Sequence, residues 1–116
     1  MKVHIRRQGD KLIVRLDGDL DLHAAAAFRE SVDEQWSASP RLRHLVVDLG
    51  GVGFIDSSGL GALLGRWRSV QGRGGRLVAV GVRPRVRKLL EMAGLLQLID
   101  VAEDGRVARD RGAGMP

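Results

Sequence analysis

The amino-acid sequence predicts a single α/β domain whose mixed β-sheet joins an N-terminal antiparallel hairpin to parallel strands and crossover helices. The chain has 116 residues, which suits one hydrophobic core and is short for two domains. Short apolar runs at 45–49 and 77–82 alternate with longer segments of helical periodicity. Parallel strands need such crossover connections. The pattern leaves open whether helices cover one face of the sheet or both.

The first part of the chain is expected to form the hairpin and one helix. Apolar and polar residues alternate over 3–5 and 12–16, on either side of a turn near Gly9. After the hairpin, Asp21 can act as the N-cap of a helix that ends near Gln35. Apolar residues recur on one face of that helix, namely Phe28, Val32 and Trp36.

The second part predicts a strand, a helix, a strand and a helix in succession. The first of these helices runs to about Gln71, where glycines follow. Its apolar residues recur at helical spacing: Leu60, Leu63, Leu64, Trp67 and Val70. After the strand at 77–82, Pro84 suits the first turn of a helix that Gly94 closes. A last short strand is expected at 96–101.

Composition excludes several classes of protein. The chain has no cysteine, which rules out disulfides, thiolate metal sites and a cysteine nucleophile. No apolar run approaches the roughly 18–20 residues of a membrane span, and the first residues lack a secretory pattern. We therefore expect a cytoplasmic protein without a membrane partner. Its packed core should cover about 3–101, with a weakly ordered tail at 103–116.

The basic charge is less informative than its size suggests. A net charge of +5, from 19 basic and 14 acidic residues, permits nucleic-acid binding. However, the chain has no Tyr and only two Phe and two Trp for stacking on bases. The densest basic groups are expected on solvated helix faces: Arg66, Arg68, Arg73 and Arg76, and then Arg83, Arg85, Arg87 and Lys88. No direct contact with nucleic acid is predicted.

The most informative segment, at 48–61, runs from a strand through a glycine-rich loop into the start of a helix. In parallel α/β sheets, binding sites gather beyond the carboxyl ends of the strands, where the next helix presents free N–H groups. Asp56, Ser57 and Ser58 lie at that helix start. Their simplest role is N-capping, for which Asp and Ser are favoured, and capping is compatible with a function.

Enzyme motifs are missing from this segment. A nucleophile elbow requires G-x-S-x-G, but residues 56–59 read D-S-S-G. The glycines fit neither a phosphate-binding P-loop nor a dinucleotide fingerprint, in which Leu64 would have to be glycine. His4, His23 and His44 are dispersed, so no catalytic base is expected. The acidic residues lack metal-ligand spacing, and neither a metal nor a cofactor is predicted.

A serine that receives a phosphoryl group fits this segment better. Phosphorylation adds about −1.5 to −2 charges near neutral pH. The free N–H groups and the dipole at a helix N-terminus tolerate that charge, so the fold need not melt. A partner packed on this surface would face a bulky dianion and bind less tightly. Such a serine would act as a reversible binding switch.

The residues of this segment resemble those of a known family. The stretch FIDSSGLGALLGR at 54–66 is similar to the phosphorylation loop and following helix of anti-sigma-factor antagonists, which are STAS-domain proteins. The sporulation antagonists that free sigma factor F look most similar. Further similarity lies within 74–95, and GDLDLHA at 18–24 resembles the family's Gly-Glu-Leu-Asp turn with Asp19 in place of Glu. The resemblance covers about residues 3–101 and implies one STAS domain.

This resemblance implies a non-enzymatic regulator. In the family, the unphosphorylated antagonist binds a dimeric anti-sigma factor, which is also an ATP- and magnesium-dependent serine kinase, and thereby frees the sigma factor. Ser57, directly after the aspartate, would be the phosphoacceptor, and a PP2C-type phosphatase would reset it. ATP belongs to the kinase, so this chain would need no cofactor. The implied partner-facing residues are Asp19, Asp21, His23, Asp56, Ser58, Gly59, Leu60 and Gly61.

Other STAS interaction modules remain alternatives. A general stress or stressosome regulator and a subunit of a lipid-transport complex share the same features. The family's last helix usually carries apolar periodicity, whereas residues 103–116 are glycine-rich and charged. The arginine-rich composition suits an unusually acidic partner or reflects compositional bias. The sequence does not decide which sigma factor is controlled.

Overall fold

The structure, a computed structural model, describes residues 1–102; the tail predicted to be weakly ordered, at 103–116, lies outside the described residues. Within the described part, strands and helices alternate after an initial hairpin. Their order is β1 (Lys2–Gln8), β2 (Lys11–Asp17), α1 (Leu22–Ala38), β3 (His44–Gly51), α2 (Ser57–Gly72), β4 (Leu77–Val80), α3 (Pro84–Met92), the 3₁₀-helix η1 (Leu95–Gln97) and β5 (Asp100–Val101).

The strands form one mixed sheet in the order β1-β2-β3-β4-β5. β1 and β2 pair antiparallel, and a positive φ of 62° at Gly9 allows the tight turn between them. The β2–β3, β3–β4 and β4–β5 pairs are all parallel. The predicted combination of a hairpin with parallel strands is confirmed.

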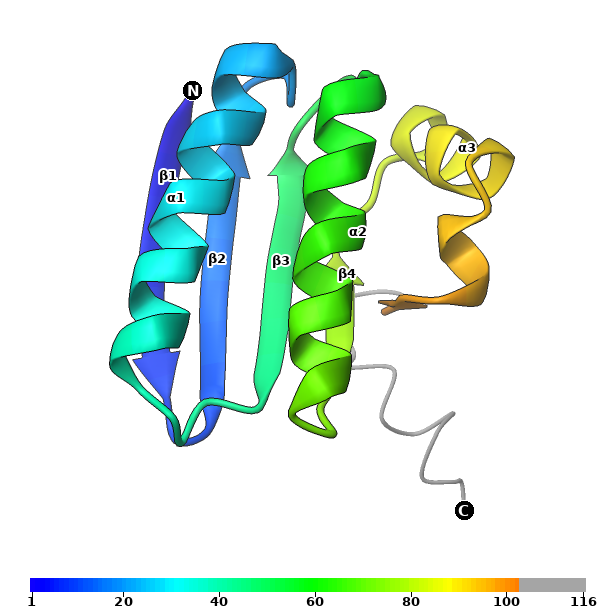
Figure 1. Cartoon of the computed structure of the whole chain (residues 1–116). Helices are drawn as coiled ribbons and strands as arrows, with labels where there is room; N and C mark the ends of the chain where they lie inside the picture. The colour runs from blue at the N-terminus through cyan, green and yellow to red at the C-terminus, as the bar shows by residue number, and fades with distance from the viewer. Residues whose placement is uncertain (103–116) are drawn as a thin grey trace.

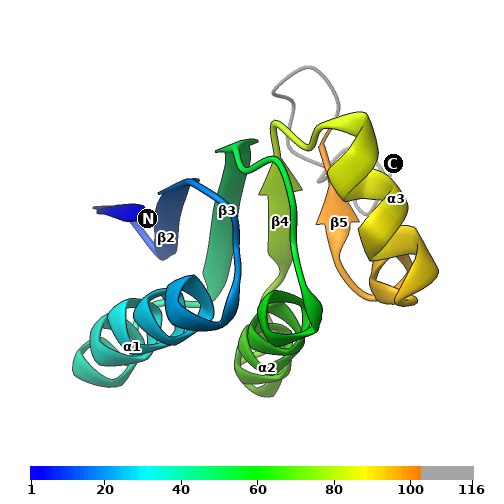
Figure 2. The same cartoon turned by 90° about the horizontal axis from the view of Figure 1, so that it is seen from above.

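Helices α1 and α2 cover the same face of the sheet and run side by side, as Figure 1 shows. The view from above in Figure 2 places α3 beside β5, at the edge of the sheet away from β1. The opposite face of β1 and β2 carries exposed side chains, among them His4 and Arg15. This arrangement answers the question that the sequence left open: the two long helices share one face.

The core lies between the sheet and these two helices. Alternate residues of β2 and β3 are fully buried and point toward α1 and α2: Leu12, Val14, Leu16, Leu45, Val47 and Leu49. From α1, the three apolar residues singled out in the sequence meet them: Phe28, Val32 and Trp36. Burial of this apolar surface stabilises the fold and fixes where α1 and α2 begin.

Three predicted boundaries differ from the structure. The first helix extends to Ala38, beyond Gln35, because Trp36 still packs in the core with 8% of its surface exposed. The strand predicted at 77–82 ends at Val80, since Gly81 has a φ of 66° that an extended strand does not allow. The last predicted strand, at 96–101, shrinks to Asp100–Val101, because the turn after Gly94 winds into η1 instead.

The expectation of solvated arginines along the second long helix is wrong in part. Arg66 is buried, and Arg73 caps the end of α2 with its guanidinium turned inward. Arg73 donates hydrogen bonds to the carbonyl oxygens of Trp36, Ser39 and Leu42 at 2.8–3.0 Å. It also lies over the Trp36 ring, 4.3 Å from the centroid. Because Arg66 is buried and Arg73 is bonded to carbonyl oxygens, neither guanidinium belongs to an exposed basic face.

Candidate phosphorylation and partner-binding site

The N-termini of α1 and α2 lie at the end of the sheet where β2 and β3 finish, and each is capped by an aspartate. The Asp21 carboxylate accepts a hydrogen bond from the Ala24 N–H at 3.0 Å, and the Asp56 carboxylate accepts one from Gly59 N–H at 3.0 Å. Both caps have extended backbones, as N-caps require. The predicted capping role of Asp21 is confirmed, and Asp56 plays the same role for α2.

The segments before the two helices are held together by backbone hydrogen bonds. Leu20 donates its N–H to the Phe54 carbonyl at 2.9 Å, and Asp56 donates its N–H to the Leu20 carbonyl at 3.3 Å. Leu20 and Ile55 thus form an isolated parallel bridge, with both side chains buried. The bridge brings the turn at 19–23 against the loop before Ser57, although about 35 residues separate them in the chain.

Gly59 makes this close approach possible. A Cβ atom at Gly59 would collide with the Leu20 carbonyl oxygen and would lie 2.7 Å from Cγ2 of Ile55. Gly61, two residues further along the helix, has nothing within 4 Å of its own hypothetical Cβ. The two glycines of the G-L-G sequence therefore have different roles. Gly59 allows close packing, whereas Gly61 leaves open space at the surface.

The glycine-rich loop before Ser57 is anchored from the side of α3. Val52 and Ile55 are buried in the core. Arg83 Nε donates a hydrogen bond to the Gly50 carbonyl at 3.0 Å, and the Arg85 guanidinium lies 5.3 Å from the centre of the Phe54 ring. The loop that presents Ser57 is therefore a fixed platform.

Ser57 is the first residue of α2, and its side chain is exposed, whereas Asp56 and Ser58 are half-buried. Within residues 1–102, neither its hydroxyl nor its backbone N–H forms a hydrogen bond. The hydroxyl is thus available to a kinase. The free N–H groups at this helix end suit an anion placed on the same residue.

The predicted partner-facing residues fall into two neighbouring hollows and a supporting set. Asp19, Asp21 and His23 line a hollow of about 390 Å³ that also includes Met1. Ser57, Ser58 and Gly61 line a second one of about 300 Å³ between α1 and α2. The remaining predicted residues line neither of these two hollows: Asp56, Gly59 and Leu60. Gly59 is buried and Leu60 packs partly against the core, so both shape the surface from beneath.

Sequence reasoning did not single out three residues of the second hollow, namely Leu22, Arg29 and Arg66. Leu22 is 64% exposed, so a large apolar side chain faces solvent beside the candidate site, as is common at interaction surfaces. The signal for Leu22 was its place directly after the Asp21 cap, where a helix residue faces outward. The sequence also indicated that Arg66 lies on the same helix face as Ser58, because Ser58, Ala62 and Arg66 are spaced four residues apart.

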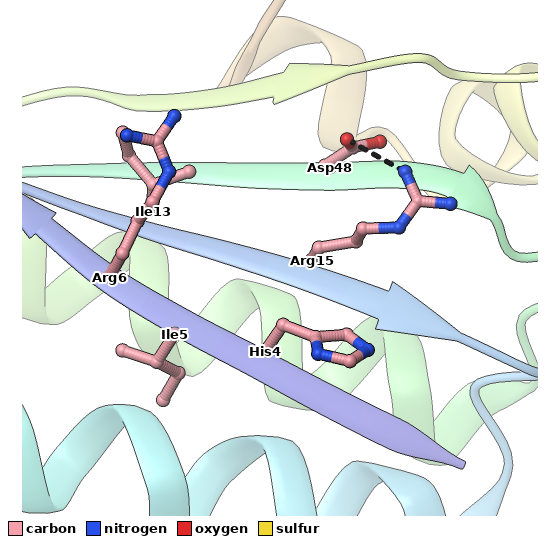
Figure 3. A pocket seen from close by; sticks show the side chains of 6 residues that line it. All are labelled: His4, Ile5, Arg6, Ile13, Arg15 and Asp48. Carbon is pink, nitrogen blue, oxygen red and sulfur yellow. Dashed lines mark hydrogen bonds and ion pairs between the residues drawn. The ribbon is translucent and has the colours of Figure 1, made fainter.

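The rest of the described surface offers less. His4, His23 and His44 lie apart from one another, in β1, α1 and β3, and no group of three or more metal-ligating side chains gathers within residues 1–102. Figure 3 shows a hollow of about 240 Å³ lined by side chains including His4, Arg15 and Asp48. Arg15 pairs there with Asp17 and Asp48 at 3.1 and 3.2 Å. A hydrogen bond and attraction from Asp17, with help from Asp48, raise the pKa of Arg15.

Comparison with known proteins identifies the fold. A sequence profile of the STAS domain matches residues 2–108. The chain belongs to the STAS domain family. Its mixed sheet, with two long helices on one face and the D-S-S-G segment at the start of α2, is the STAS architecture in this chain. None of the helices in residues 1–102 is long and apolar enough to cross a membrane.

Within this family, the chain is similar to antagonists of anti-sigma factors. The chain is 34% identical to an anti-sigma F factor antagonist of Paenibacillus polymyxa, over 90% of this chain and 88% of the relative. It is 26% identical to the anti-sigma-B factor antagonist of Bacillus subtilis, over 88% of this chain and 91% of the relative. The STAS chain is therefore a member of the anti-sigma factor antagonist family.

Solved structures agree with this assignment. The unphosphorylated form of the anti-sigma factor antagonist SpoIIAA superposes with a TM-score of 0.79 at 27% identity, covering 99% of both chains. The phosphorylated form of SpoIIAA superposes with a TM-score of 0.71 at 26% identity, covering 96% of this chain and 99% of that one. A relative of this STAS chain therefore exists in two phosphorylation states with the same fold.

Proposed function

We propose that this STAS protein is an anti-sigma factor antagonist that binds an anti-sigma factor while Ser57 is unmodified and releases it when Ser57 is phosphorylated. The observation that carries the proposal is the exposed, unbonded Ser57 hydroxyl at the start of α2, within the family's D-S-S-G segment. The kinship with antagonists of sigma F and sigma-B regulators supports it. The chain acts by binding and performs no catalysis of its own.

The switch is electrostatic and needs no rearrangement of the fold. Before phosphorylation, the surface at the start of α2 presents the exposed apolar Leu22 beside small polar side chains. An anti-sigma factor can cover this surface and exclude water from it. A phosphoryl group would place about −1.5 to −2 charges there, next to the Asp56 carboxylate. Burying that dianion under a partner without a matching cation would cost about 2–5 kcal/mol of binding free energy.

The anti-sigma factor is proposed to be the kinase as well, using its own ATP and magnesium, and to be a dimer. A PP2C-type phosphatase would remove the phosphoryl group and restore binding. Both partners follow from the family resemblance, and Ser57 as the acceptor follows from its place after Asp56. The predicted cytoplasmic location fits partners of this kind.

Phosphate mapping tests the acceptor residue. The wild-type chain, Ser57→Ala and the matched control Ser58→Ala are incubated with the anti-sigma kinase of the same organism and ATP, and phosphate is located by mass spectrometry. Wild type and Ser58→Ala should each gain one phosphoryl group on Ser57, and Ser57→Ala should gain none. Phosphate on Ser58, or on no residue of the wild-type chain, would contradict the assignment.

Binding measurements with the same variants test the switch. Ser57→Ala should bind the anti-sigma factor as tightly as the wild type, because a small side chain at this exposed position removes no internal contact. Ser57→Asp should bind more weakly, since it places a carboxylate on the docking surface. Equal binding by wild type and Ser57→Asp would count against a charge-based switch.

Two sigma factors are candidates for control by this chain. The 34% identity to the Paenibacillus polymyxa antagonist favours sigma F, and the 26% identity to the Bacillus subtilis antagonist makes sigma B the second candidate. Both candidates share the proposed chemistry and differ only in the sigma factor that is freed. The genes beside the coding sequence separate them, because a neighbouring kinase and sigma-factor gene identifies the controlled pathway.

A further inference from the structure

The groove between α1 and α2 contains two arginines that the proposed switch does not use. Arg29 from α1 and Arg66 from α2 line the same hollow of about 300 Å³ as Ser57, Ser58 and Gly61. Because Gly61 has no side chain and nothing lies within 4 Å of where its Cβ would be, the groove stays open near Ser57. Two cations thus line a groove that opens beside Ser57 and extends along α2 as far as Arg66.

Arg66 is incompletely paired although it is buried. Only 9% of its surface is exposed. Its Nε lies 3.1 Å from Oδ1 of Asp33, close enough for an ion pair but without hydrogen-bond geometry. Its Nη1 has no hydrogen-bond partner among residues 1–102. Buried donors are normally paired, because they have lost their water. A guanidinium on a groove wall whose hydrogen bonds are incomplete therefore points to an acceptor that comes from outside the described residues.

Arg29 adds a second positive charge to the same groove. Its side chain is exposed and forms no ion pair within the described part of the chain. Burial lowers the pKa of Arg66, attraction by Asp33 opposes this shift, and repulsion by Arg29 adds to it. The two guanidiniums repel each other and, within residues 1–102, only Arg66 has a carboxylate partner, Asp33. An anion between the two arginines would relieve that repulsion.

The start of α2 supplies further donors. The backbone N–H groups of Ser57 and Ser58 donate to no acceptor within residues 1–102, since the Asp56 cap takes the N–H of Gly59. Free N–H groups and the positive end of the helix dipole favour an anion at this end of the groove. The arginines and the helix end therefore favour the same charge from two sides.

We propose that the α1–α2 groove, which opens at the N-terminus of α2, is a receptor for a tetrahedral oxyanion of the phosphate class held by the guanidiniums of Arg66 and Arg29. Two sources supply this chemistry. One is the phosphoryl group on Ser57 of the same chain, and the other is a free phosphate ion. The first source rests on the proposed function, because it needs Ser57 as the phosphoacceptor, whereas the second does not.

A titration with inorganic phosphate tests the receptor itself. Nitrogen-15 NMR spectra of the full chain are recorded at constant ionic strength while phosphate replaces chloride. The side-chain Nε–H signals of Arg66 and Arg29 and the backbone N–H of Ser58 should shift along one saturable curve. The exposed Arg68 on the same helix lies outside the groove, and its signal should not move.

Substitution of Arg29 identifies the cation without disturbing the core. Arg29→Gln removes an exposed charge and should weaken phosphate binding at least about tenfold, the loss expected for one charge-assisted hydrogen bond. Arg68→Gln removes an equal charge elsewhere and should leave the affinity unchanged. Equal weakening by both variants would show that phosphate responds only to net charge, which would overturn the proposal.

A chain carrying phosphoserine at position 57, made by peptide ligation, separates the two sources. No kinase or anti-sigma factor is needed, so this test can fail independently of the proposed function. If the phosphoryl group fills the groove, the Arg29 and Arg66 side-chain signals are already displaced and free phosphate no longer moves them. If free phosphate binds as before, it is the source. The receptor is ruled out when neither form of phosphate moves the two arginine signals.

Discussion

Single atoms decide how Ser57 is presented, and the two glycines of the G-L-G sequence show this best. Gly59 lies against the Leu20 carbonyl, where a methyl group has no room, while Gly61 faces open space. A glycine-rich helix start is often interpreted only as flexibility. Here one glycine allows the loop at 19–23 to pack beside α2, and the other keeps the groove open.

The substitutions Gly59→Ala and Gly61→Ala form a matched pair. Gly59→Ala should destabilise the fold by about 1–3 kcal/mol or more, because the added methyl overlaps backbone and buried side chains. Gly61→Ala should be neutral or stabilising by up to about 1 kcal/mol, since alanine is the better helix former. Urea unfolding followed by circular dichroism gives both values. Similar destabilisation by the two variants would contradict the packing described for Gly59.

Substitution of the N-capping aspartates gives a second test at the level of individual residues. Asp56→Ala removes the acceptor for the Gly59 N–H and should cost about 1 kcal/mol of unfolding free energy, or roughly 4–8 °C in Tm. Asp21→Ala should cost a similar amount at α1. Asp56→Asn is the control, because asparagine caps nearly as well, and it should keep most of the stability. A loss with Asp56→Asn as large as with Asp56→Ala would mean that the charge, and not the cap, is what matters.

The sequence predicted many of these residues, but it missed others for a definite reason. Capping rules found Asp21 and Asp56, because N-capping is local to a few residues. Ser57 as the phosphoacceptor came from the family resemblance and stays a prediction. Leu22 and Arg66 were not singled out, because their significance depends on α1 and α2 lying side by side. Residue spacing gives the face of each helix, whereas the neighbouring helix depends on the whole sheet.

Among the helices and strands, the end of α2 is tied to the end of α1 by one side chain. Arg73 donates to three carbonyl oxygens, two of which, those of Trp36 and Ser39, lie at the C-terminus of α1. Its guanidinium also stacks on the Trp36 ring. Cations favour helix C-termini, where carbonyl groups lack partners. One arginine thus holds both long helices in place at the end opposite to Ser57.

Arg73→Met should therefore destabilise the protein by about 2–4 kcal/mol, because several charge-assisted hydrogen bonds are lost and the carbonyl oxygens lose their donor. Arg68→Met, on the exposed side of the same helix, should change stability by no more than about 0.5 kcal/mol. Thermal and urea unfolding of the two variants make the comparison. A cost for Arg73→Met as small as that for Arg68→Met would contradict the tie between the helices.

The order of strands and helices followed from periodicity, and their boundaries did so only in part. Alternation gave the hairpin, the Asp21 cap gave the start of α1, and Pro84 gave the start of α3. The end of β4 depended on the positive φ of Gly81, and the last segment on how Leu95 enters the core. Both features arise from contacts distant in sequence, which a local pattern does not contain.

In the complete fold, the packed sheet and helices hold the proposed switch residue, Ser57, in a fixed position at one end of the sheet. The sheet and the two helices on one face bring two N-termini together, and the core fixes them. The arginines add less free positive surface than a net charge of +5 suggests, because Arg66 and Arg73 are turned inward. In the proposed mechanism, regulation depends on what is attached to Ser57 and not on a change of fold.

The same view makes a prediction about stability on phosphorylation. A chain with phosphoserine at position 57 should keep its circular dichroism spectrum, and its Tm should fall by no more than a few degrees, because a helix N-terminus accepts negative charge. A Tm lower by about 10 °C or more would correspond to more than about 1 kcal/mol of lost stability. That result would indicate that phosphorylation acts by loosening the fold.

Titration calorimetry of the anti-sigma factor with two forms of this chain decides whether charge at Ser57 controls docking. Unmodified chain and chain carrying phosphoserine at position 57 are compared at the same salt concentration and nucleotide state. The dissociation constant should rise at least about thirtyfold on phosphorylation, equivalent to about 2 kcal/mol or more. Equal dissociation constants for the two forms would contradict the proposed switch.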